Sequence, residues 1–284
     1  TCLDALVKGV APDAGLHHLL AWRFAFAAMV SVPLFLRSGR PRPTIEAIRF
    51  HTFRGLVQLA AAITFFYALT QLALAEATIY GFTAALMVPI LGWLILKEPI
   101  SRIAVLATLI GFFGAVITAG TGNVVSTPDS NRTLGLIAVF AAAFLYAMVL
   151  ILLRMRARSE DALTIAMFTN TVPAIIMLPV LLGLFGFPNW TDLPSFALLG
   201  VLGFCVWYLM TLGYARAPAQ RLAPIEYTAI VWSSLLGALF FEEVPGWNLY
   251  AGGAVIIVAC LMVAYEDHQS KRRDANAETS DASV

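Results

Sequence analysis

The spacing of the charged residues is the feature that most constrains the fold of this chain. Short polar segments separate long apolar ones. Only 12% of the 284 residues are charged, and 60% are hydrophobic. A soluble domain carries about a quarter charged residues. The apolar segments are about 20 residues long, which is the length an α-helix needs to cross the hydrocarbon core of a bilayer. The sequence therefore predicts an all-α polytopic membrane protein.

Ten apolar segments predict ten transmembrane helices. They fall at 1–11, 16–36, 53–73, 76–96, 102–121, 133–153, 162–186, 194–215, 220–241 and 247–265. The first is half the length of a span, and we interpret it as a truncated helix whose beginning is missing. We expect 122–132 to be a linker loop, since it is rich in turn formers. We expect 266–284 to be a disordered tail, because it is polar and without apolar periodicity.

The basic residues predict the orientation in the membrane. The loops on one side, together with the tail, hold fifteen Lys and Arg residues, and the opposite loops hold only Lys8 and Arg132. Cytoplasmic loops carry an excess of Lys and Arg. Both termini are therefore expected in the cytoplasm, with loop 122–132 outside. For a bacterial protein this would be the plasma (inner) membrane.

A short pattern occurs twice, at an offset of 145 residues. The segment LGWLILKE at 91–98 aligns with LGALFFEE at 236–243, and six positions between 83 and 98 are identical in the two copies. Five helices per half is an odd number, so the two copies must cross the membrane in opposite directions. The sequence thus predicts two inverted five-helix repeats, 1–121 and 133–265. Alternating-access transporters are often built in this way, with the substrate near the midplane between the repeats.

The order of several short motifs gives a family resemblance. The motifs are Asp4–Lys8, Trp22-Arg23-Phe24, Phe66–Leu69 followed by Ala75–Thr78, Leu96–Pro99 and Gly111–Gly114, with looser versions at Arg216–Arg221 and Phe241–Pro245. Together they resemble the EamA family of the drug/metabolite transporter superfamily, over essentially the whole chain. The resemblance implies a transporter with one EamA unit in each half. It leaves the substrate open among amino acids, nucleotide-like metabolites, sugars and drugs, since one scaffold serves many functions.

Arg23 is the most informative single residue. It lies inside the second predicted helix, where a charge is costly unless it is paired or hydrated. It is a candidate for binding a substrate carboxylate or phosphate. The alternatives are that it snorkels outward or pairs with Asp4. Asp4 and Lys8 are spaced four residues apart, so we expect them to form an ion pair along the first helix.

Four glutamates flank the repeated helices. Glu76 and Glu226 open them, where a carboxylate is stabilised by the helix dipole, and Glu98 and Glu243 end them, where it is not. We expect basic or backbone partners for the last two, and structural or gating roles for Glu76, Glu98 and Glu243. Glu226 is also a candidate for proton coupling, because it shares a polar helix face with Ser233 and Gly237.

Aromatic and small polar residues gather where a midplane site is expected. The remaining substrate-binding candidates are Tyr67, Tyr80, Thr83, Asn170, Trp207, Tyr208 and Tyr227. Tryptophan and tyrosine commonly lie at the membrane interface, but Tyr80, Asn170 and Trp207 lie too deep in their helices for that. Packing is the alternative role for all of them.

These features favour a secondary transporter that exports small organic solutes such as amino acids or related metabolites. The alternatives are a transporter of cationic drugs or nucleoside-like metabolites, and a non-transporting receptor or assembly subunit. No catalytic motif is present, and the cysteines Cys2, Cys205 and Cys260 are not spaced for a metal site. We therefore expect no enzyme activity, cofactor or metal. The expected partners are a small-molecule solute and the lipid bilayer, without nucleic acid, for a monomer or a homodimer.

Overall fold

Every element that the computed structural model describes is a helix. The description covers residues 1–40, 43–97, 102–121, 131–156, 160–216, 219–243, 246–262 and 265, without the side chains of 103–104, 116–121 and 213–227. The helices are α1 (Cys2–Ala14), α2 (Leu16–Arg37), α3 (Ile45–Gln71), α4 (Leu74–Gly81), α5 (Thr83–Leu91), the π-helix η1 (Gly92–Leu96), α6 (Arg102–Thr121), α7 (Arg132–Arg156), α8 (Ala162–Leu184), α9 (Leu193–Arg216) and α10 (Ala219–Phe241). An unlabelled helix, Trp247–Met262, follows them.

Six of these segments are long and apolar enough to cross a membrane. They are Leu16–Arg37, Ile45–Gln71, Leu74–Leu96, Arg132–Arg156, Ala162–Leu184 and Leu193–Leu212. Three further apolar helices are shorter within the described residues: Val105–Ala115, Thr228–Phe241 and Trp247–Met262. The polytopic membrane character predicted from the sequence is confirmed, whereas the number of ten spans remains a prediction.

The third helix begins well before the predicted residue 53. Thr44 precedes it and its Oγ1 accepts a hydrogen bond from Ala47 N at 3.2 Å, which caps the first turn. Arg54, at the very start of the predicted segment 53–73, therefore lies well inside α3. Arg54 is 1% exposed and donates hydrogen bonds to Ile165 O (3.0 Å) and Thr169 Oγ1 (2.7 Å) of α8.

The predicted helix 76–96 is one span in three pieces. It is interrupted at Phe82, whose N–H reaches both Thr78 O (3.3 Å) and Ile79 O (3.2 Å), and it widens into η1 shortly after Pro89. A proline removes one helical hydrogen bond and clashes with the preceding turn, so it favours such a change of pitch. The span ends at Lys97, which has a left-handed backbone with φ of 56°.

The helices pack in specific pairs. Helix α2 packs against α8 and α9, α3 against α7 and α8, α5 against α7, and α4 against α10. Small residues allow the backbones to approach closely, as is usual in membrane bundles. A Cβ at Gly200 of α9 would lie 2.8 Å from Arg23 O of α2, and a Cβ at Gly55 of α3 would lie 2.6 Å from Val172 of α8.

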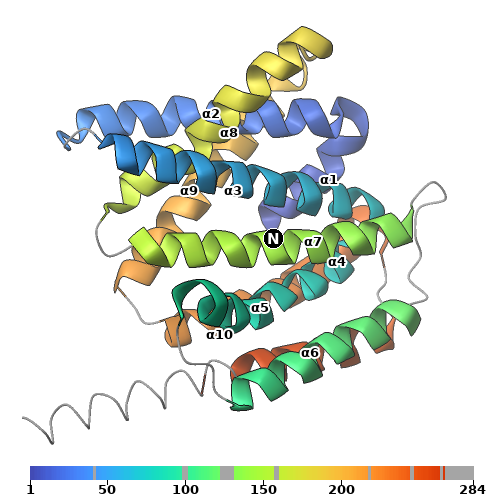
Figure 1. Ribbon diagram of the computed structural model, residues 1–284. Helices are drawn as coiled ribbons and strands as arrows, with labels where there is room; N and C mark the ends of the chain where they lie inside the picture. Colours follow the sequence, from blue (N-terminus) through green and yellow to red (C-terminus); the bar gives the residue numbers. More distant parts are fainter. Residues whose placement is uncertain are drawn as a thin grey trace, which may run out of the picture.

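Helix α6 and the helix Trp247–Met262 lie together at the side of the bundle remote from α2 (Figure 1). A Cβ at Gly111 of α6 would lie 3.0 Å from Ala259, so the two helices touch there. Large apolar side chains such as Phe113 and Val258 are exposed on this pair. An extended exposed apolar surface of this kind suits contact with lipid and not with water.

Candidate functional site

A cavity of about 360 Å³ lies inside the bundle. Its walls come from α1, α2, α3, the broken span α4–α5, α7, α9 and α10. Pockets of about 300–1,000 Å³ are typical of small-molecule sites. Most of the wall is apolar, and it includes several small residues, among them Ala61, Ala62, Ala142 and Ala143. The few polar side chains in it therefore determine what it can bind.

Arg23 of α2 lines this cavity and is 5% exposed. Its guanidinium carbon lies 4.2 Å from the ring centroid of Phe24 and 5.0 Å from that of Phe66. Its Nε is buried without a hydrogen-bond partner, and no acidic side chain among the described residues forms an ion pair with it. Arg23 is thus a buried cation that contacts two aromatic rings beside an open volume.

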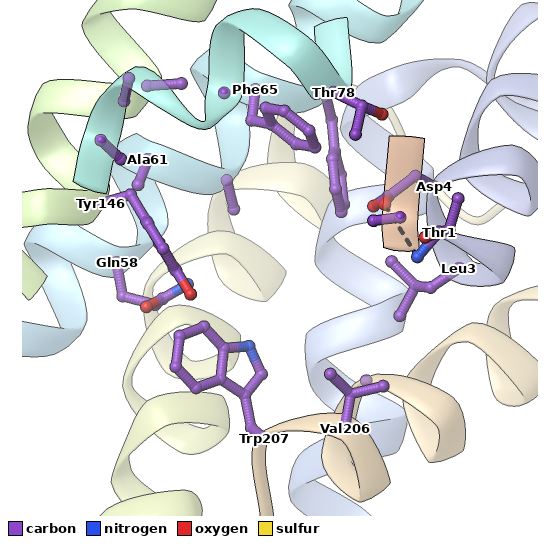
Figure 2. A pocket seen from close by; sticks show the side chains of 18 of the residues that line it. Thr1, Leu3, Asp4, Gln58, Ala61, Phe65, Thr78, Tyr146, Val206 and Trp207 are labelled. Atoms are coloured by element: carbon purple, nitrogen blue, oxygen red, sulfur yellow. Dashed lines mark ion pairs between the residues drawn. The ribbon is translucent and has the colours of Figure 1, made fainter. Parts of the chain in front are cut away.

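Asp4 of α1 lines the same cavity but does not bond to Arg23. Its carboxylate lies 3.2 Å from the amino group of Thr1, the ion pair drawn in Figure 2. The guanidinium lies against Gly203 of α9, where an added Cβ would be 3.0 Å from Arg23 Nη1 and 3.7 Å from Leu3 Cδ1. The absence of a side chain at Gly203 leaves the room that the guanidinium occupies.

The opposite side of the cavity carries a polar amide and two aromatic rings. Figure 2 shows Gln58, Tyr146 and Trp207 facing Leu3 and Asp4 across the opening. The rings of Tyr146 and Trp207 are tilted by 58°, with centroids 6.1 Å apart. Gln58 is 5% exposed, and its Oε1 is buried without a hydrogen-bond partner among the described residues.

The break between α4 and α5 borders this cavity. Thr78, Gly81, Phe82 and Ala85 all line it, and they flank the turn between α4 and α5. Interrupted helices at membrane depth are found where the backbone lines a cavity. The break thus places helix ends and a turn beside the volume that a solute would occupy.

The structure brings only some of the predicted binding residues together. Arg23 and Trp207 line the cavity, whereas Tyr67, Tyr80, Thr83, Asn170 and Tyr208 are not among the residues that line it. Tyr80 is fully buried and its ring lies 5.6 Å from that of Phe140. Thr83 of α5 donates to Tyr80 O of α4 at 2.6 Å, and Asn170 donates to Ala166 O of its own helix α8 at 2.8 Å, so both side-chain donors are bonded to nearby backbone.

The two remaining tyrosines also pack elsewhere. Tyr208 stacks on Phe204 at a centroid distance of 5.7 Å, and Tyr67 packs at the edge of the main core.

Three other candidates lie outside the part of the chain that the structure describes. Glu98 is outside the described residues, and the side chains of Glu226 and Tyr227 are not described.

A second group of charged residues connects α1 and α4 with α7 and α10 outside the cavity wall. Lys8 Nζ lies 2.6 Å from Glu243 Oε1 and also contacts Leu72 O. Glu243 Oε2 accepts a hydrogen bond from Leu74 N, the first residue of α4, at 2.7 Å. The prediction of an Asp4–Lys8 ion pair is therefore wrong, because Glu243 and a backbone carbonyl occupy the Lys8 ammonium.

Glu76 belongs to the same group. It is 1% exposed, in the first turn of α4, and pairs with Arg132 Nη2 at 2.7 Å. Lys8, Glu76, Arg132 and Glu243 thus connect α1, α4, the start of α7 and the end of α10. We call these four residues the interhalf cluster.

The sequence analysis passed over several residues that line the cavity, above all Gln58, Phe66, Tyr146 and Gly203. Gln58 and Tyr146 did carry a signal, since each is a polar group in the middle of an apolar segment. Phe66 was named only within a family motif and Gly203 carried no signal, because aromatic and small residues are common throughout membrane helices.

Sequence comparison identifies relatives over nearly the whole chain. The chain is 26% identical over 249 residues to an S-adenosylmethionine uptake transporter of Rickettsia prowazekii, covering 88% of this chain and 83% of that protein. It is 25% identical to a riboflavin transporter of Brucella anthropi, covering 88% of each chain. It is 24% identical to a pseudopaline exporter of Pseudomonas aeruginosa, covering 92% of this chain and 90% of that protein.

Comparison with a solved structure and comparison with a family sequence pattern both match nearly the whole chain. A solved crystal structure superposes with a TM-score of 0.63 over 94% of both chains at 20% identity, which establishes a shared fold. The sequence pattern of the EamA-like transporter family matches residues 5–120 and again residues 133–265. Its relatives are transporters and not enzymes. The chain is an integral membrane protein that belongs to the EamA-like transporter family.

Proposed function

We propose that this protein is a secondary transporter of small organic solutes that carry an acidic group, and that Arg23 binds that group in the central cavity. The observation that carries the proposal is the state of Arg23, which is buried beside an open volume with no ion-pair partner among the described residues. A charge at membrane depth is costly unless paired or hydrated. A solute carboxylate or phosphate would supply the missing partner, and the bidentate geometry of arginine suits either one.

The pairing of helices supports an inverted repeat. In such a repeat α1, α2, α3 and the α4–α5 span correspond to α7, α8, α9 and α10. The pairs α2–α8 and α4–α10 then correspond to themselves, while α3–α7 corresponds to α1–α9, and α2–α9 to α3–α8. All of these pairs are in contact, as a two-fold axis between the halves would require.

The local backbone supports the same offset of 145 residues. Helix α4 begins at Leu74 and α10 begins at Ala219. The two positive-φ residues other than glycine in the described chain are Lys97 and Glu242, which end the corresponding helices with φ of 56° each. A left-handed backbone is uncommon for such residues, so its repetition at equivalent positions favours two copies of one unit.

The relatives support an amino-acid-like solute as the first substrate class. S-adenosylmethionine, which gives one relative its name, is an amino acid with a free carboxylate. The relatives include both uptake transporters and an exporter. The proposal therefore concerns the solute and its binding site, and not the direction of transport. Alternating access would expose Arg23 to the two sides of the membrane in turn.

The test is solute counterflow in proteoliposomes with radiolabelled S-adenosylmethionine and L-methionine as probes. Arg23→Gln should lower the apparent affinity for both by about tenfold or more, because a charge-assisted hydrogen bond is worth roughly 1.5–3 kcal/mol. Arg23→Lys should retain part of the affinity, since it keeps the charge and loses the planar fork. Arg49→Gln, which removes an exposed arginine from α3, is the matched control.

The outcome that contradicts the proposal is equally specific. If Arg23→Gln folds normally by gel filtration and binds both acidic probes as tightly as the parent protein, then Arg23 is not the site of the acidic group. Binding that falls equally in Arg49→Gln would show a general effect of charge and not a site.

A further inference from the structure

The cavity has two polar ends of different chemistry. Arg23 Nη1 lies at the end next to Leu3, because Arg23 Nη1 and Leu3 Cδ1 both lie within 4 Å of the position that a Cβ of Gly203 would take. Gln58, Tyr146 and Trp207 lie at the other end, across the opening from Leu3 (Figure 2). A solute that fills the cavity would therefore meet a cation at one end and an amide with two rings at the other.

Gln58 is not explained by packing. It lies in the middle of α3, between apolar neighbours, and is buried with its Oε1 unbonded among the described residues. An unbonded buried amide oxygen lowers stability, and a leucine of nearly the same size would avoid this. If the oxygen and nitrogen of the amide were exchanged, a donor would be left unbonded in the same place. Gln58 also lines the cavity, so a polar amide is part of this otherwise apolar wall.

The two rings form a corner and not a stacked pair. Tyr146 and Trp207 are tilted by 58° at 6.1 Å. A flat group placed against one ring meets the edge or tilted face of the other, and both arrangements are favourable between aromatic groups. Ala61 and Ala62 of α3 and Ala142 and Ala143 of α7 also line the cavity, and their short side chains leave room beside the rings.

We propose that this protein selects solutes in which an acidic group is joined to a planar heteroaromatic ring, and that Gln58, Tyr146 and Trp207 form the subsite for the ring. The proposal rests on the assignment of Arg23 as the binding site of the acidic group. The ring stacks in the Tyr146–Trp207 corner, and its edge exchanges a hydrogen bond with the Gln58 amide. Aliphatic acids reach only Arg23 and bind more weakly.

The experiment measures binding to the full chain in lipid nanodiscs, by calorimetry, with two series of probes. The first series is L-tryptophan, tryptamine and L-alanine, and the second is adenosine 5′-monophosphate, adenosine and ribose 5-phosphate. In each series the first compound carries both ring and acid, the second lacks the acid, and the third lacks the ring. At least one of the complete compounds should bind about tenfold or more tightly than both of its truncated partners.

Variants assign that advantage to the subsite. Gln58→Leu should remove about tenfold of the affinity for the complete compound and leave that of the acid-only probe unchanged. It should also raise or preserve thermal stability, because it removes the unbonded amide. Trp207→Ala should act on the same probe, while Tyr208→Ala changes the next residue of α9, which lies outside the cavity wall, and serves as its control.

The results separate this inference from the proposed function. If neither complete compound exceeds its truncated partners, or if the advantage persists in Gln58→Leu, the ring subsite is refuted while acid binding at Arg23 can stand. If Arg23→Gln leaves the affinity of every acidic probe unchanged, the proposed function fails, and this inference fails with it.

Discussion

At the scale of single residues, two glycines of α9, three positions apart, have different neighbours. Gly200 brings α9 onto the backbone of α2, where a Cβ would lie 2.6 Å from Phe26 Cβ and 2.8 Å from Arg23 O. Gly203 faces the cavity, where a Cβ would lie 3.0 Å from Arg23 Nη1. A backbone cannot yield to an added methyl group, but the end of a flexible side chain can. The same substitution should therefore have different effects at the two sites.

Gly203→Ala is expected to weaken the binding of acidic probes about three- to tenfold with little loss of stability, because the guanidinium must move away from the methyl group. Gly200→Ala is expected to lower the free energy of unfolding by about 1–3 kcal/mol, because it separates α2 from α9. The measurements are probe affinity and thermal stability in the same detergent. Equal loss of stability in both variants would contradict the assignment of Gly203 to Arg23.

At the scale of elements, the ion pairs and hydrogen bonds of the interhalf cluster connect α1 and α4 to α7 and α10. Glu243 has two separate tasks in it, since one oxygen pairs with Lys8 and the other caps the first turn of α4. Both side chains are mostly buried, so the loss of one partner leaves a charge without compensation. Such a charge costs more than the pair itself contributes.

Glu243→Gln is expected to lower the free energy of unfolding by about 3 kcal/mol, because the Lys8 charge loses its partner while an acceptor for Leu74 N remains. Lys8→Met in the same chain should recover part of this loss, because it removes the unpaired charge. Glu243→Leu should cost about 1 kcal/mol more than Glu243→Gln, since the helix cap is lost too. Chemical unfolding in detergent measures all of these variants, and additive effects of Lys8→Met and Glu243→Gln would disprove the coupling.

At the scale of the whole molecule, the proposed architecture requires a definite topology. Two inverted five-helix halves with basic loops on one side place residues 37–52 and 154–161 in the cytoplasm, and residues 121–132 outside. The interhalf cluster then lies near the outer face, since Arg132 and the α3–α4 turn are on that side. Arg54 is one of the fifteen basic residues that predicted the cytoplasmic side. It is buried in α3 and is not a loop charge, but the asymmetry of the other fourteen keeps the same sign.

Single cysteines test this topology after replacement of Cys2, Cys205 and Cys260. A cysteine at Ser38 or Glu160 should be protected from an impermeant maleimide in intact cells and become reactive after permeabilisation. A cysteine at Asn131 should react in both conditions. Labelling at Ser38 in intact cells would contradict the inverted arrangement and the cytoplasmic location of the termini.

The sequence by itself determined the membrane character and the family, because apolar length and motif order are properties of the chain alone. It also indicated the repeat, since six positions are identical between 83–98 and 228–243. It singled out Arg23 as well, because a charge within a span is conspicuous. The start of α3 and the break at Phe82 were less accessible, because a cap and a turn depend on local hydrogen bonds that several sequences can make.

Only the tertiary structure decided which polar residues share a cavity. Tyr80 and Trp207 look alike in sequence, yet one is buried in packing and the other lines the opening. Likewise, Lys8 has a candidate partner four residues away, but its partner is Glu243 in the other half. Local spacing gives the angle of a side chain around its own helix, whereas its contacts depend on the rotation and tilt of the neighbouring helices. Those are set by close approaches such as that of Gly200, and they are determined by the packing of the whole bundle.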